Sequence, residues 1–112
     1  MKVTLSDKFK ERWDEYLDYG VTNYGKTLAN KKNEHLISIL KRLELFPESG
    51  RIEPLLQGMV KEYRAVNYDK LFKIIYTITE NEIIIENLWN MKRNPKSLKK
   101  DIYPQIQNSH FV

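Results

Sequence analysis

Basic side chains are concentrated near the end of the chain, where they could hold an anion. After residue 87 the sequence contains five lysine or arginine residues and a single acidic residue, Asp101. Such a patch favours a polyanion or an acidic protein as the binding partner. A solvated basic tail explains the same charges equally well, so charge alone leaves both interpretations open. The cations are Lys92, Arg93, Lys96, Lys99 and Lys100.

A second pair of cations, Arg64 and Lys73, lies in segments where apolar and polar residues alternate. A two-residue hairpin turn at Tyr68-Asp69 is expected between these segments. Counting outward from that turn places Arg64 directly opposite Lys73 on the open face of a sheet. Like charges in that arrangement destabilise a sheet, and a phosphate bound between them would remove the cost. The alternative is that both side chains extend into water, and a longer turn would change the pairing.

The segments that carry these two cations are expected to be strands of an antiparallel sheet. Residues 63–66 and 72–78 alternate with a period of two, and residues 83–89 are rich in isoleucine. β-Branched and aromatic residues of this kind are typical of strands. A second tight turn is expected at Glu80-Asn81. The apolar face of this three-stranded meander would be the core, formed by Tyr63, Ala65, Phe72, Ile74, Tyr76 and Ile78.

Two amphipathic helices precede the strands and are expected to cover that apolar face. Ser6 or Asp7 can cap the first helix, which is connected to the second through residues 20–25. The second helix is expected from about Thr27 to Phe46, where a proline follows. With a short strand at residues 3–5, the order is β-α-α-β-β-β. The predicted fold class is α+β, an antiparallel sheet with a helical hairpin packed on one face.

Length and composition indicate one globular domain. The 112 residues suit a single hydrophobic core, so one domain is expected over residues 1–112, with residues 96–112 forming a basic C-terminal tail or a short helix. The sequence has no cysteine and two isolated histidines, so neither a metal site nor another cofactor is expected. No stretch resembles a signal peptide or a membrane span. A cytoplasmic protein that does not bind membranes is therefore expected.

Four motifs occur along the chain in an order that is typical of one protein family. They are Leu43-Glu44-Leu45-Phe46-Pro47-Glu48-Ser49-Gly50, Glu62-Tyr63-Arg64, Leu71-Phe72-Lys73-Ile74-Ile75-Tyr76 and Leu88-Trp89-Asn90-Met91-Lys92-Arg93-Asn94-Pro95. Their order and spacing, over residues 1–96 or so, resemble the RelE/ParE superfamily of type II toxin–antitoxin systems. The resemblance implies the same β-α-α-β-β-β fold and a small toxin that is neutralised by a cognate antitoxin.

The resemblance implies two kinds of target. RelE-like members cut mRNA within the ribosome, whereas ParE-like members inhibit DNA gyrase and are not known as nucleases. Arg64, Lys73 and Arg93 match the basic side chains that RelE-like toxins use, so a ribosome-dependent mRNA endoribonuclease is the first expectation. A ParE-like inhibitor of gyrase and a degenerate member that only binds its antitoxin are the alternatives.

In the ribonuclease interpretation a ribose 2′-hydroxyl attacks the neighbouring phosphate. The resemblance then makes Arg64, Lys73 and Arg93 the catalytic residues. Arg64 and Lys73 would bind phosphate and stabilise its developing charge, while Arg93 would contact the scissile phosphate. Lys73 could serve as the base if Arg64 beside it favoured the neutral amine. Further contacts to RNA are expected from Lys92, Lys96, Lys99 and Asn90.

Three positions depart from the ribonuclease pattern. Val66 stands where a second basic residue is expected, Lys99 where RelE-like enzymes have a tyrosine, and Asn90 where some branches have a histidine. Tyr103 is a substitute for the missing tyrosine if the tail folds back. Lysine is then the one general base left. The nuclease interpretation stays open because positioning and charge stabilisation carry much of this chemistry.

Overall fold

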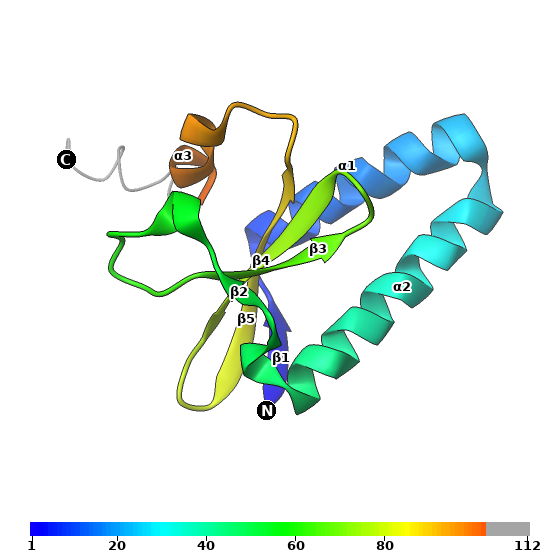
Figure 1. Cartoon of the computed structure of the whole chain (residues 1–112). Helices are drawn as coiled ribbons and strands as arrows, with labels where there is room; N and C mark the ends of the chain where they lie inside the picture. The colour runs from blue at the N-terminus through cyan, green and yellow to red at the C-terminus, as the bar shows by residue number, and fades with distance from the viewer. Residues whose placement is uncertain (103–112) are drawn as a thin grey trace.

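The fold combines one mixed sheet with a long helical hairpin (Figure 1). The structure is a computed structural model, which describes residues 1–102 except for the side chains of residues 21–24. The α+β prediction is confirmed, with one addition: β1 pairs in parallel with β5. The sheet order is β1-β5-β4-β3-β2. The elements are β1 (Lys2–Leu5), α1 (Asp7–Tyr24), α2 (Lys26–Leu45), β2 (Arg51–Ile52), β3 (Arg64–Tyr68), β4 (Phe72–Ile78), β5 (Glu82–Asn90) and α3 (Leu98–Ile102), with short 3-10 helices η1 (Pro47–Ser49), η2 (Pro54–Leu56) and η3 (Pro95–Ser97).

The first helix begins where the sequence predicts but ends later. The Oγ atom of Ser6 accepts a 3.0 Å hydrogen bond from the backbone N–H of Phe9, which satisfies one free donor at the start of α1. α1 then continues to Tyr24, so the connection is shorter than the expected residues 20–25 and consists of Gly25 alone. Gly25 has a φ of +85°, a conformation that glycine adopts without steric cost.

The hairpin between β3 and β4 differs in register from the prediction. Its loop contains three residues, 69–71, where two were expected. Asp69 adopts a left-handed conformation with a φ of +58°, which a short polar side chain tolerates better than a bulky one. Arg64 is consequently paired with Tyr76. The predicted pairing of Arg64 with Lys73 is therefore wrong.

The helical hairpin covers one face of the sheet and forms the main core. Aromatic residues of α1, such as Phe9 and Trp13, meet apolar residues of β4 and β5 there. This confirms the expected position of Ile74 and Tyr76, while Tyr63 belongs to the other face. The buried residues of this core are Phe9, Trp13, Leu36, Leu43, Tyr68, Ile74, Tyr76, Ile83, Ile85 and Leu88.

The opposite face of the sheet, which was expected to be open and basic, is covered. The short helices η2 and α3 lie side by side over it (Figure 1). They contribute Leu56 and Leu98 to a second core that includes Ile75 and Trp89 of the sheet, and all four side chains are buried. The prediction of an open face is therefore wrong, because η2 and the short helix α3 pack on this face.

The described chain ends with α3, within the segment expected to be a basic tail or a short helix. The rest of that segment, including Tyr103, lies outside the described residues. Across residues 1–102, no helix combines the length and the apolar character needed to cross a membrane.

Candidate functional site

The guanidinium of Arg64 is engaged in hydrogen bonds within the protein. Its Nη1 atom donates to the carbonyl oxygen of Gly50 over 2.9 Å and more weakly to that of Glu48 over 3.4 Å. Because residues paired across a ladder share a face, its pairing with Tyr76 places Arg64 on the face that the helices cover. Arg64 therefore ties β3 to the segment that follows α2.

Lys73 lies on the other face of the sheet and is neutralised by Glu53. Three positions separate Lys73 from Tyr76 on β4, and successive side chains of a strand alternate between faces. The Nζ atom of Lys73 forms an ion pair with Oε1 of Glu53, whose side chain is 2% exposed. The second carboxylate oxygen accepts a 3.0 Å hydrogen bond from the backbone N–H of Leu55. The pair therefore fastens the start of η2 to the sheet.

Arg93, in the turn after β5, lies beside the same face as Lys73. Its guanidinium carbon is 4.5 Å from the centroid of the Trp89 ring, within the range of a cation–π interaction. Trp89 is itself paired with Lys73 across the ladder. Of the three predicted catalytic residues, the structure thus brings Lys73 and Arg93 to a common neighbour and leaves Arg64 on the opposite face.

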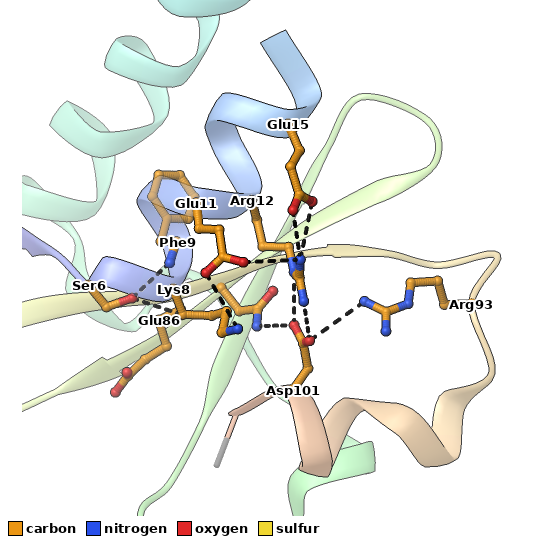
Figure 2. A network of polar contacts seen from close by, with 10 residues as sticks. Ser6, Lys8, Phe9, Glu11, Arg12, Glu15, Glu86, Arg93 and Asp101 are labelled. Atoms are coloured by element: carbon orange, nitrogen blue, oxygen red, sulfur yellow. Dashed lines mark hydrogen bonds and ion pairs between the residues drawn. The ribbon is translucent and has the colours of Figure 1, made fainter. Parts of the chain in front are cut away.

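Asp101 of α3 is the centre of a polar network that the sequence interpretation did not assign to a function (Figure 2). Two nitrogen atoms of Arg12 donate to its two oxygens over 2.5 and 3.2 Å, and Nδ2 of Asn87 donates over 2.7 Å. Burial raises the pKa of Asp101, but the hydrogen bonds from Arg12 and Asn87 outweigh it, so the pKa lies below its usual value. The one sequence signal was that Asp101 is the single acid among the C-terminal cations.

The four residues expected to contact RNA extend from the last residue of β5 through the following connection into α3. The Oδ1 atom of Asn90 accepts a 2.9 Å hydrogen bond from the backbone N–H of Lys92, so Asn90 shapes the turn that carries Arg93. Lys92, Lys96 and Lys99 are exposed. Within residues 1–102 none of these three side chains forms an ion pair. Their contact with RNA stays a prediction.

Comparison with known proteins identifies the family. The model of the ParE toxin of type II toxin–antitoxin system, parDE, matches residues 3–95. The chain belongs to the ParE toxin family. A toxin–antitoxin system implies a cognate antitoxin as the partner of this toxin.

A solved structure supports the fold of this ParE family member. It is described as "Chromosomal ParDE TA system from P. aeruginosa" and is similar to the chain with a TM-score of 0.65. The two sequences are 19% identical, and the match covers 80% of this chain and 95% of that chain. At this identity the likeness shows the fold alone. No curated protein matches the sequence significantly.

This ParE family chain also has an apolar groove between the helical hairpin and the β3–β4 turn. Its volume is about 630 Å³. Leu17 of α1, Phe72 of β4 and Leu88 of β5 are among its lining residues. Among the described residues, four cationic and two acidic side chains also line the groove, so the net charge of its lining is positive. The charged residues are Arg12, Lys32, Lys92, Arg93, Glu15 and Asp69.

Both acids of this groove already have partners. Glu15 is 3.1 Å from Arg12, and Asp69 accepts hydrogen bonds from Nζ of Lys32 over 2.6 Å and from the hydroxyl of Tyr16 over 3.0 Å. The hydrogen bond from Lys32 is the main cause that lowers the pKa of Asp69. Within residues 1–102 no group of histidine and acidic side chains could hold a metal ion. The groove is therefore suited to an apolar and acidic polypeptide.

Proposed function

We propose that this chain is a toxin that inhibits DNA gyrase by binding it and does not cut RNA. One observation carries the proposal: Arg64 and Lys73, the two cations expected to bind phosphate and stabilise its developing charge, do not converge. Arg64 donates to backbone carbonyls on one face, and Lys73 is paired with buried Glu53 on the other. Stabilising a transition-state phosphate needs donors that are already aimed at it. Gyrase is the target that the likeness to ParE toxins implies.

Among the described residues, the predicted catalytic set also lacks a side chain placed for the proton transfers of RNA cleavage. The attacking 2′-hydroxyl needs a group that takes its proton. Lys73 already directs its ammonium group at Glu53, and the side chain of Asn90 accepts a hydrogen bond within its own turn. The side-chain amide of Asn90 can therefore neither accept nor supply the proton near neutral pH. These arrangements favour a toxin that acts by binding over one that acts by catalysis.

We further propose that the antitoxin binds in the groove between the helical hairpin and the β3–β4 turn. The groove offers an apolar floor, and its acids are paired while Lys92 carries no ion pair among the described residues. An amphipathic segment with acidic side chains would bury apolar surface and meet these cations. A segment that is disordered when free would gain order on binding there.

A supercoiling assay tests the proposed target. Gyrase is incubated with relaxed plasmid and increasing amounts of the full-length chain, with and without its antitoxin. The proposal predicts that supercoiling falls with toxin dose and recovers when antitoxin is added. Unchanged supercoiling at toxin levels that arrest growth would exclude gyrase. Arrest with cleaved transcripts would then favour the ribonuclease alternative, and normal growth would indicate a degenerate family member.

A further inference from the structure

The two segments that cover the second face of the sheet each contribute a buried carboxylate. Glu53, just before η2, is 2% exposed, and Asp101 of α3 is 8% exposed. Acidic residues are almost never buried to this extent unless they are paired. Each carboxylate forms an ion pair with a cation from another element: Glu53 with Lys73 of β4, and Asp101 with Arg12 of α1. Residues 53–56 and 98–102 together are called the clasp below.

We propose that the clasp masks an anion-binding face of this chain, and that its carboxylates occupy the positions of phosphate groups of a single-stranded nucleic acid. The face consists of Lys73, Trp89 and Arg93 on one side of the sheet, and Arg12 reaches Asp101 from α1. While the clasp covers this face, the carboxylates of Glu53 and Asp101 neutralise the cations of the face. An opened clasp leaves the same donors free for a polyanion. The inference is independent of the proposed action on gyrase.

The surroundings of Asp101 have the geometry of a site for an oxyanion (Figure 2). Arg12 approaches its carboxylate with two nitrogen atoms, the fork by which guanidinium groups also hold phosphate. The amide of Asn87 adds a third donor, and Nη1 of Arg93 lies 3.7 Å away. Donors from α1, β5 and the following turn therefore converge on one anionic group.

The surroundings of Glu53 add a cation and an aromatic ring to this face. Lys73 is paired with Trp89 across the ladder, and the guanidinium of Arg93 lies over the Trp89 ring. Trp89 is only 1% exposed, in the core that Leu56 and Leu98 of the clasp complete. Proteins that bind single-stranded nucleic acids combine cations for the backbone with aromatic rings for the bases. The chemistry of the masked face therefore fits a single-stranded nucleic acid, for which single-stranded RNA is a suitable probe.

Several features of the clasp lower the free energy needed to open it. Buried ion pairs contribute little net stability compared with apolar packing. The Oδ1 atom of Asn87 is buried without a hydrogen-bond partner within residues 1–102, although such atoms are normally satisfied. The helices of the clasp are short, three residues in η2 and five in α3. Short covering segments open at a lower free energy than the central strands.

Neutral variants of the clasp carboxylates test the inference. Glu53→Gln, Asp101→Asn and the double variant of the full-length chain are titrated against a labelled single-stranded RNA at several salt concentrations. Each freed cationic site should steepen the slope of log affinity against log salt by about 0.7, and affinity at low salt should rise about tenfold or more. Glu34→Gln is the matched control, because it changes net charge equally at an exposed position of α2.

Folded variants that bind RNA no better than the Glu34→Gln chain would overturn the inference. The variant Glu53→Gln with Lys73→Met should return to wild-type binding, because it removes the freed cation as well. If Glu53→Gln alone does not melt cooperatively, Asp101→Asn alone tests the inference, because that variant leaves the pair of Glu53 and Lys73 intact. RNA binding and plasmid supercoiling are separate readouts, so failure here leaves the proposed action on gyrase unaffected.

Discussion

Arg64 and Lys73 lie on opposite faces of the sheet, although they are on neighbouring strands. Arg64 is paired with Tyr76 in the β3–β4 ladder, and Lys73 is paired with Asn67. A shift of one residue moves a side chain to the other face. Arg64 consequently helps to close the main core, while Lys73 joins the second. The predicted phosphate site therefore separates into two structural contacts.

The ion pair between Lys73 and Glu53 should be strongly coupled. Lys73→Met removes the cation and leaves Glu53 buried without a counter-charge, which should lower the free energy of unfolding by about 3 kcal/mol. Adding Glu53→Gln to that variant should restore at least about 1 kcal/mol, because the unpaired charge is gone. Urea unfolding of the two single variants and the double variant measures the coupling. Additive effects would show that the pair is not formed.

Gly50 should not accept a side chain. A Cβ atom there would lie 2.5 Å from the hydroxyl oxygen of Tyr76 and 2.9 Å from the carbonyl oxygen of Ala65. Gly50→Ala should therefore destabilise the chain by about 1–3 kcal/mol. Gly20→Ala is the control, because a Cβ at this position of α1 meets no atom within 4 Å and should stabilise the helix by about 0.5–1 kcal/mol. Thermal melts that shift in the same direction for both would contradict this packing.

Asp69 should tolerate asparagine better than alanine. Its φ of +58° lies in the left-handed region, which costs ordinary residues about 1–2 kcal/mol and asparagine less. Asp69→Asn loses the charge that meets Lys32, and Asp69→Ala loses the conformational preference as well. The alanine variant should therefore melt at a clearly lower temperature than the asparagine variant. Equal melting temperatures would mean that the turn does not depend on this conformation.

Asp101 should make stability depend on acid pH. Because its pKa is lower in the folded chain than in the unfolded chain, its carboxylate stabilises the fold above the unfolded value, and this contribution is lost as the pH falls through the folded value. Arg12 keeps its charge throughout, because its pKa is raised by the hydrogen bond to Asp101. The difference in unfolding free energy between wild type and Asp101→Asn should be constant from about pH 7 to 5 and shrink below about pH 4. If the difference in unfolding free energy stays the same at low pH, the effect of Asp101→Asn comes from changed packing of the side chain and not from its lost charge.

Local patterns predicted most of the elements. The cap at Ser6 and the strand over residues 72–78 need only neighbouring residues, and both are observed. Turn length was not predictable in the same way, because nothing in the alternation of residues 63–78 reveals that Asp69 adopts a left-handed conformation. One additional loop residue was enough to change which face Arg64 occupies.

The cover of the second face could not be predicted from periodicity. Leu56 is the one buried residue of η2, and Leu98 is the one buried apolar residue of α3, so neither segment repeats an apolar pattern that would mark it. The contacts of Glu53 with Lys73 and of Asp101 with Arg12 join segments that are distant in sequence. Pairing of this kind depends on the tertiary fold. The sequence therefore identified the cations correctly as unusual but not the carboxylates that neutralise them.

The most direct test of the central claim is the integrity of cellular mRNA after this chain is induced alone. Abundant transcripts are mapped by primer extension before and after growth stops. We expect growth arrest with intact transcripts, because Arg64 and Lys73 are held on separate faces by partners of their own. New cleavage sites within translated regions, present with the wild-type chain and absent with Arg93→Ala, would contradict it.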